Sequence, residues 1–226
     1  MKKTYNIMVV GPGRWGSFLT WYLDRIGNKV TLYGRNEAII ELLDTRCNNY
    51  VSFNKNIKIT SDLNEIVKQD IIVISIPSQA LFGFMQEIKE YNLRNKTFIL
   101  CMKGLDTTRN KRLSEIVSEN TDSSNNVVVW IGPGHVQEFY RGIPNCMVID
   151  SKNNVIKEEL VNNLSSDYST IKELEEFTVI CRRGSLAKAS KELFMSPQGL
   201  SRVLKNLENE LDCTLVNRVA SGLELT

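Results

Sequence analysis

Short apolar runs alternate with amphipathic stretches from Tyr5 to Ser151, which is the pattern of β-α units. The apolar runs are rich in Ile and Val, as strands buried on both faces of a parallel sheet usually are. The predicted strands are Asn6–Val10, Lys29–Tyr33, Asp70–Ile76, Thr97–Met102, Asn126–Ile131 and Asn145–Ile149. The predicted helices are Gly16–Ile26, Asn36–Leu43, Leu63–Lys68, Ala80–Glu90, Lys111–Glu119, Val136–Arg141 and Val155–Leu164. The pattern therefore predicts an α/β fold with a doubly wound parallel sheet.

The periodicity changes after Ser165–Asp167, and no run with the character of a strand occurs between Ile171 and Thr214. Three helices are predicted instead, at Lys172–Arg183, Leu186–Phe194 and Pro197–Leu211, with a short hairpin in Leu215–Thr226. Ser185 and Ser196 are candidate N-caps. The apolar positions expected to form the core of this helical segment are Phe177, Ile180, Ala189, Leu193, Leu200, Val203, Leu204, Leu207 and Leu211. We therefore expect two domains, residues 1–168 and a small, mainly α-helical domain at residues 171–226.

Composition and charge narrow the class of protein. The chain has 226 residues, of which 42% are hydrophobic, and this supports packed cores rather than disorder. Five scattered cysteines without C-x-x-C spacing argue against a disulfide framework or a metal site, so reduced thiols in a cytoplasmic protein are expected. The apolar run Ile7–Val10 stops at Gly11, so no membrane span is expected there. A formal net charge of +2 argues against a broad basic surface but allows a local basic patch.

A glycine fingerprint, Gly11-Pro12-Gly13-Arg14-Trp15-Gly16, follows the first predicted strand and opens an amphipathic helix. In this context Gly11 permits the tight turn, Gly13 lets the backbone approach a pyrophosphate, and Gly16 permits close packing of helix on strand. The N-terminus of the helix would stabilise the anion. The fingerprint therefore predicts a Rossmann-like domain that binds NAD or NADP.

The second predicted strand ends without the acidic residue that usually holds the ribose 2′-hydroxyl of NAD. Gly34-Arg35-Asn36 stands there instead. Arg35 can pair with a 2′-phosphate, so the site is compatible with NAD and NADP, and Arg35 would favour NADP. The alternative is an ordinary solvated arginine.

Four motifs follow one another in the first domain, namely Gly11–Asn36, Pro77-Ser78-Gln79-Ala80, Lys103-Gly104-Leu105-Asp106 and Gly132-Pro133-Gly134-His135-Val136-Gln137-Glu138. Their order and spacing resemble the N-terminal cofactor domain of NAD(P)-dependent glycerol-3-phosphate dehydrogenase. The resemblance implies cofactor contacts by Arg14, Trp15, Arg35 and Val136, a lysine shared by cofactor and substrate phosphate at Lys103, and substrate contacts by Gly132 and Gly134. Gly134 departs from the family's usual Ser or Thr, which removes a hydroxyl donor.

The resemblance to the dehydrogenase ends near Ile171. In that family a second, helical domain supplies a proton-exchanging lysine in a G-x-L-K-N context. Leu204-Lys205-Asn206 has the last three letters, but it lacks the glycine and lies within a helix of another pattern. His135 is the only histidine and is expected to pack rather than to exchange protons. We therefore assign no catalytic residue and expect turnover to be absent or very low.

The segment from Leu174 to Thr226, with Gly184-Ser185, Ser196–Ser201 and Gly222–Thr226 among its motifs, resembles the winged helix-turn-helix of LysR-type transcription regulators. The resemblance implies binding of double-stranded DNA. The polar positions left outside the expected core, which we take as DNA-binding, are Ser196, Gln198, Ser201, Arg202 and Lys205 on the third helix and Arg218 in the wing. A polar helix face that contacts no nucleic acid is the alternative.

The expected DNA contacts differ in kind. Gln198, near the start of the third helix, can reach base edges, whereas Arg202, Lys205 and Arg218 would hold phosphates. From Ile171 onward, eight basic and eight acidic residues cancel. Binding would therefore come from a local face and be weak and sensitive to salt.

These observations leave three hypotheses. The first is an NAD(P)-binding transcriptional regulator, a homodimer that responds to redox cofactor or glycerol phosphate and lacks the catalytic helical domain. The second is a reduced glycerol-3-phosphate dehydrogenase that interconverts glycerol 3-phosphate and dihydroxyacetone phosphate. The third is a gene fusion with neither activity.

Overall fold

The computed structural model of the chain describes residues 3–35, 42, 45–47, 51–132, 136, 146–165, 170–173, 175–192, 196–211, 214–219 and 222–225. The chain divides into two compact units, Met1–Ile171 and Lys172–Thr226. Within the described residues, every helix is too short or too polar to cross a membrane.

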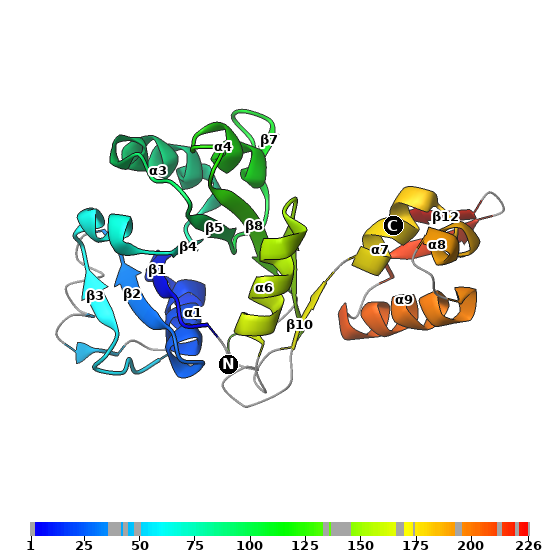
Figure 1. The fold of residues 1–226 in the computed structure, drawn as a ribbon, viewed down its shortest axis with the longest axis horizontal. Coiled ribbons are helices and arrows are strands. Elements are labelled where there is room, and N and C mark those ends of the chain that lie inside the picture. Colours follow the sequence, from blue (N-terminus) through cyan, green and yellow to red (C-terminus); the bar gives the residue numbers. More distant parts are fainter. Residues whose placement is uncertain are drawn as a thin grey trace. The chain divides into compact units, whose positions relative to one another are not determined.

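The first unit is built on an eight-stranded sheet in the order β10-β9-β8-β5-β4-β1-β2-β3 (Figure 1). Six of its strands pair in parallel, and the order reverses between β1 and β4, which is the doubly wound arrangement that the sequence predicts. These strands are β1 (Asn6–Val10), β2 (Lys29–Tyr33), β3 (Lys58–Thr60), β4 (Ile71–Ile74), β5 (Thr97–Leu100) and β8 (Asn126–Ile131). The Rossmann-like fold is therefore confirmed.

Alternate residues of the strands fill two separate cores, one on each face of the sheet. Ile7 and Val9 of β1 join the core that the sheet forms with α1 (Arg14–Arg25) and α6 (Asn154–Leu164). Met8 and Val10 join the core under α3 (Leu81–Ile88) and α4 (Leu113–Glu119). Both faces of β1, β2, β4 and β5 are buried, which explains their continuous apolar sequence.

Some predicted helices differ from the structure in detail. Leu63–Lys68 is a 3-10 helix (η1), and the predicted helix Ala80–Glu90 consists of η2 (Ser78–Ala80), α3 and η3 (Lys89–Tyr91). A short hairpin of β6 (Leu105–Asp106) and β7 (Lys111–Arg112) precedes α4, where the predicted helix began at Lys111. The predicted helices Asn36–Leu43 and Val136–Arg141 lie outside the described residues, apart from Leu42 and Val136.

The edges of the sheet depart from the prediction. β9 (Cys146–Ser151) runs antiparallel to β8, so the expectation of a wholly parallel sheet is wrong here. β10 (Thr170–Glu173) pairs next to β9, which corrects the prediction of a helix from Lys172. Neither β3 nor β10 is predicted by the sequence, because a short edge strand pairs on one side only and shows a weak apolar pattern.

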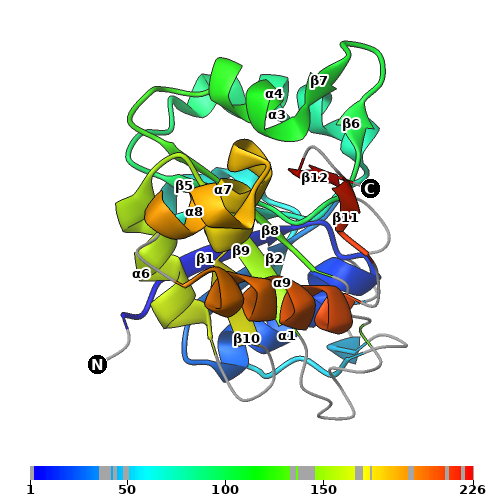
Figure 2. The ribbon, with the colours of Figure 1, turned by 90° about the vertical axis from the view of Figure 1, so that its right-hand side faces the viewer.

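The second unit contains α7 (Glu175–Arg183), α8 (Leu186–Glu192), α9 (Pro197–Leu211) and an antiparallel hairpin of β11 (Val216–Val219) and β12 (Gly222–Leu225) (Figure 2). This confirms the predicted three helices and hairpin. The N–H of Leu223 donates to the carbonyl of Gly184 at 2.8 Å, which ties the hairpin to the α7–α8 turn.

The core of the second unit agrees with the helical spacing in its sequence. Ile180, Ala189, Leu200 and Leu204 are buried together, as predicted. Val179 and Val216 join them. The predicted core side chains of Phe177, Leu193, Val203, Leu207 and Leu211 lie outside the described residues.

Candidate functional site

The glycine fingerprint forms the turn between β1 and α1. The N–H of Gly11 donates to the carbonyl of Tyr33 at 2.9 Å, so the turn is tied to the end of β2. Gly11 has a φ of +106°, and a Cβ there would lie 2.5 Å from the carbonyl oxygen of Ser75. A Cβ on Gly16 would overlap the carbonyl oxygen of Gly11. Any other residue at Gly11 or Gly16 would therefore push apart the turn, α1 and the end of β4.

Gly13 has a different environment. A Cβ built on Gly13 meets nothing within 4 Å, so this side of the turn is open. Gly13 is the N-cap of α1, and its cap lacks a side-chain hydrogen bond. The first turn of α1 contains no acidic residue. The open turn and the N–H groups of a 12-residue helix fit a pyrophosphate, because an anion can accept hydrogen bonds there.

A cavity of about 300 Å³ lies at the carboxyl ends of β4, β5 and β8. Three residues predicted for the site, Trp15, Lys103 and Gly132, line it together with Ser75, Ile76, Cys101, Met102 and Ile131. Lys103 is exposed, so its charge can reach a ligand in the cavity. Burial raises the pKa of Cys101, so this thiol is a neutral part of the wall. The cavity lies at the edge of the sheet where doubly wound folds bind their ligands.

The loop after Lys103 is braced by two of the predicted motifs. The side-chain amide of Gln79 donates to the carbonyl of Leu105 at 2.9 Å. Asp106 is buried and accepts hydrogen bonds from the backbone N–H and the guanidinium of Arg109. Burial opposes ionisation of Asp106, but these hydrogen bonds keep its pKa below the ordinary value. Arg109 belongs to none of the predicted motifs, because only the folded loop brings it onto Asp106.

Arg35 lies just after β2, near the same edge of the sheet, and its side chain is 59% exposed. Its guanidinium forms an ion pair with the carboxylate of Glu87 on α3. Glu87 belongs to none of the motifs, and its separation of 52 positions from Arg35 in the sequence hides the contact.

The remaining predicted residues of the first unit are placed as follows. Arg14 is exposed in the first turn of α1. Val136 is buried in the core that the sheet forms with α1 and α6. Gly134 and His135 lie outside the described residues.

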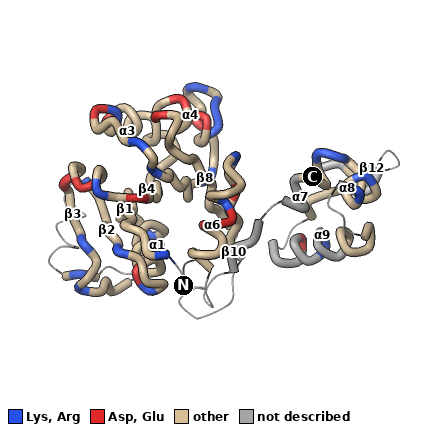
Figure 3. Tube along the Cα trace, in the orientation of Figure 1, with Lys and Arg blue, Asp and Glu red and all other residues tan. Residues whose placement is uncertain are grey.

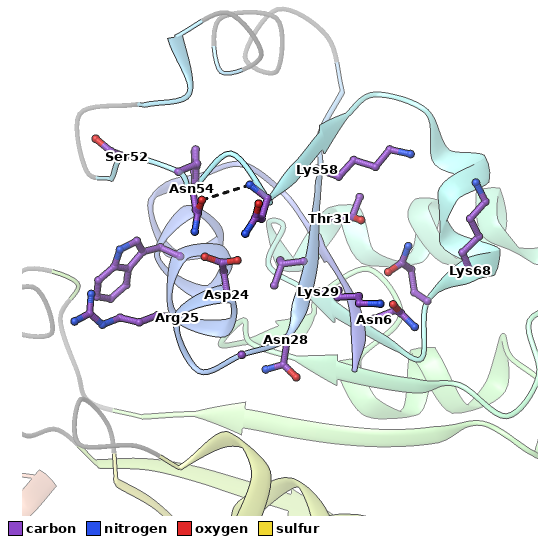
Figure 4. Close-up of a pocket in the computed structure, with 16 residues that line it drawn as sticks. Asn6, Asp24, Arg25, Asn28, Lys29, Thr31, Ser52, Asn54, Lys58 and Lys68 are labelled. Carbon is purple, nitrogen blue, oxygen red and sulfur yellow. Dashed lines mark hydrogen bonds between the residues drawn. The ribbon is translucent and has the colours of Figure 1, made fainter. Parts of the chain in front are cut away.

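A larger cavity, of about 1060 Å³, opens at the amino ends of β1, β2 and β3 (Figure 4). Arg25 lies on the opposite side of the drawn site from Lys58 and Lys68. Lys58 and Lys68 both pair with Glu65, at 2.6 and 2.7 Å. Burial raises the pKa of Asp24, and a hydrogen bond with Asn54 lowers it by less. We assign no ligand here, because Glu65 already pairs with both Lys58 and Lys68 and the sheet edge is opposite the one that binds dinucleotides.

The predicted DNA-binding residues lie on α9 and the hairpin. Ser196 caps α9, since its hydroxyl accepts from the N–H of Gly199 at 3.0 Å, as predicted. Ser196, Gln198 and Lys205 are exposed and Ser201 is half-buried. Helical spacing places Gln198, Ser201 and Lys205 along one face of α9. The side chains of Arg202 and Arg218 lie outside the described residues.

Basic residues also occur on the preceding helix. Lys188 and Lys191 on α8 are exposed, and Figure 3 shows basic positions along this segment. Neither lysine is among the predicted DNA contacts, because the spacing of the two residues alone does not distinguish a binding face from a solvated one.

Comparison with known proteins confirms both resemblances. Residues 171–226 match the family of bacterial regulatory helix-turn-helix proteins of the lysR type. The glycerol-3-phosphate dehydrogenase [NAD(P)+] of Thermoanaerobacter sp. is 37% identical over 153 residues, which cover 66% of this chain and 46% of that protein. The enzyme of the same name from Thermotoga sp. is 30% identical over 187 residues, covering 80% of this chain and 54% of its own. The chain spans about half the length of these relatives.

Solved structures show the same fold. A glycerol-3-phosphate dehydrogenase from Coxiella burnetii superposes with a TM-score of 0.69 at 21% identity, covering 92% of this chain and 68% of its own. The structure from Dunaliella salina has a TM-score of 0.65 at 18% identity, covering 93% and 41%. Together with the glycine turn and the sheet order, the match over residues 6–157 shows that this chain belongs to the family described as NAD-dependent glycerol-3-phosphate dehydrogenase N-terminus.

Proposed function

We propose that this protein is a transcriptional regulator that binds NAD or NADP through residues 1–168 and double-stranded DNA through residues 171–226. One observation carries the proposal. The two family matches, residues 6–157 and 171–226, do not overlap and fall in separate compact units. Redox cofactor or glycerol phosphate would control DNA binding, in a cytoplasmic homodimer on a palindromic operator.

The coenzyme site is supported by the geometry of the β1–α1 turn. The open side of Gly13 and the N-terminus of α1 would hold the pyrophosphate. Trp15 lines the adjoining cavity, and Lys103 would pair with a phosphate of coenzyme or of glycerol phosphate. Gly132 lies in the same cavity, where the dehydrogenase resemblance implies a substrate contact. A bound nicotinamide supplies a hydride donor or acceptor, and in this proposal it serves as a signal.

The DNA site is supported by the exposed face of α9. Gln198 stands in its first turn and would reach base edges in the major groove. Lys205, two turns further on, would hold a phosphate, as would Arg202 and Arg218. The balance of eight basic and eight acidic residues from Ile171 onward makes this a weak site with a strong dependence on salt.

Regulation requires that the two sites be coupled. A coenzyme can act as a switch only if the coenzyme-bound protein binds DNA with a different affinity from the free protein. DNA must then change the affinity for coenzyme by the same factor.

The experiment titrates the full chain with NAD and NADP in a calorimeter and then measures gel shifts on the DNA upstream of its own gene. Gel shifts are run at two salt concentrations, with and without coenzyme. We expect saturable coenzyme binding and a DNA affinity that changes with coenzyme. Absence of both binding reactions would support a fusion without either activity and overturn the proposal.

A second candidate is a reduced glycerol-3-phosphate dehydrogenase, which is favoured by the names of the relatives and by the exposed Lys103 in the cavity. Oxidation of NADH or NADPH with dihydroxyacetone phosphate separates the two functions. The regulator should show no turnover above background. Rates typical of enzymes, on the order of 1 to 1000 per second, would establish the dehydrogenase instead.

A further inference from the structure

We infer that Glu87 makes this crevice select NAD over NADP, by holding the arginine that a 2′-phosphate needs. The inference rests on the proposed coenzyme binding and names its specificity. Arg35 by itself favours NADP, and the structure adds a carboxylate from a distant helix.

The position of Arg35 is set by the backbone around the end of β2. The carbonyl of Tyr33 accepts from the N–H of Gly11, and the N–H of Gly34 donates to the carbonyl of Thr60 at 3.3 Å. In doubly wound folds the adenosine ribose lies at this point, just beyond the second strand. Arg35 is the first basic residue after β2, so it lies where the 2′-group of the coenzyme is expected.

The position of Glu87 is set by α3. Leu81, Phe84, Met85 and Ile88 are buried in the core under this helix. Glu87 stands on its exposed side, where its carboxylate pairs with the Arg35 guanidinium. Because buried neighbours on both sides anchor the helix, Glu87 is held beside Arg35 by the fold.

The two coenzymes meet this pair differently. The 2′-phosphate of NADP would compete with the carboxylate for Arg35 and would place a second negative charge beside Glu87. The 2′-hydroxyl of NAD is neutral and leaves the ion pair intact. A carboxylate is also the group that usually accepts a hydrogen bond from this hydroxyl. Glu87 thus supplies in space the acidic group that is missing from the end of β2.

The test is calorimetric titration of the full chain with NAD and with NADP. We expect the unmodified chain to bind NAD more tightly. Glu87→Gln should raise the affinity for NADP about tenfold and change that for NAD less than about threefold. Arg35→Met in the Glu87→Gln background should remove the gain. The gain should shrink at high salt, since both side chains are partly exposed.

The matched control is Glu90→Gln, which removes an exposed carboxylate three positions further along the chain. It should leave the ratio of the two affinities unchanged. Tighter binding of NADP to the unmodified chain, or equal effects of Glu87→Gln and Glu90→Gln, would overturn the inference while leaving coenzyme binding in place. If neither coenzyme binds, the proposed function fails as well, and the two failures are thereby distinguished.

Discussion

The buried carboxylate of Asp106 accepts hydrogen bonds from both the backbone N–H and the guanidinium of Arg109, at 2.8 and 3.1 Å. The Arg109 guanidinium also lies over the ring of Phe82 on α3. These contacts close the loop that follows Lys103 and fasten it to the helix. We therefore expect the placement of Lys103 at the cavity to depend on the pair of Asp106 and Arg109, of which the predicted motif contains only Asp106.

We predict that Asp106→Ala loosens this loop, because the guanidinium of Arg109 loses its partner. The melting temperature should fall by about 5 °C, and coenzyme affinity should fall with it. Thermal unfolding followed by circular dichroism and calorimetric titration with NAD measure the two effects. Glu158→Ala, on an exposed position of α6, is the control and should change neither. Unchanged NAD affinity in Asp106→Ala would show that the loop does not position Lys103.

Two glycine substitutions distinguish the position in the fingerprint turn that faces the proposed ligand, Gly13, from the position that packs against the backbone, Gly16. Gly13→Ala should leave the melting temperature within about 2 °C, since its Cβ points into open space, and should weaken coenzyme binding at least tenfold. Gly16→Ala should destabilise the fold by about 3 kcal/mol or more, because its Cβ would overlap the carbonyl oxygen of Gly11. Denaturant unfolding and calorimetry test both. Full coenzyme affinity in Gly13→Ala would contradict the proposed pyrophosphate position.

A carboxylate on α6 makes the stability of the first unit depend on pH. Lys3 Nζ and Tyr5 Oη both donate to Oε1 of Glu159, each at 2.7 Å. The hydrogen bonds from Lys3 and then Tyr5 lower the pKa of Glu159 from 4.5. A lowered folded-state pKa means that the stabilisation is complete above the ordinary pKa of glutamate. It is then lost as the pH falls through the lower pKa of the folded protein.

We therefore expect Glu159→Gln to cost about 0.5–1 kcal/mol of unfolding free energy at pH 7 and close to nothing near pH 3. Urea unfolding at the two pH values gives the difference. Glu158→Gln, its exposed neighbour on the same helix, should cost little at either pH. A cost that persists undiminished at low pH would mean that Glu159 acts through packing rather than through its charge.

Substitutions on α9 test the assignment of base and phosphate contacts. Lys205→Ala should weaken binding to all DNA sequences alike and reduce the salt slope by about 1. Gln198→Ala should reduce discrimination between operator and unrelated DNA by about 1–3 kcal/mol. Gel shifts over a range of salt measure both. Lys152→Ala, an exposed lysine in the first unit, serves as the charge control. If Arg202→Ala and Lys205→Ala both leave affinity unchanged, the DNA-binding face has been placed wrongly.

The central strands of the first unit and most of the described helices of both units were predictable from the sequence. β1, β2 and β8 begin and end where the apolar runs do, because most of their residues are buried or partly buried and therefore apolar. The spacing of Ile180, Leu200 and Leu204 likewise indicated the core of the second unit. The glycine fingerprint also predicted the turn between β1 and α1, since close backbone contacts at Gly11 and Gly16 leave room for glycine only.

Contacts between distant segments were decided by the tertiary structure alone. The antiparallel direction of β9 and the edge strand β10 follow from pairing on an existing sheet, which their own residues do not encode. The sequence of β2 shows Arg35, but only the packing of α3 brings Glu87 against it. The local pattern of apolar and polar residues indicates which positions of a helix or strand are buried. The charge that a side chain meets depends on which elements pack together, and in this protein that relation determines the expected choice of coenzyme.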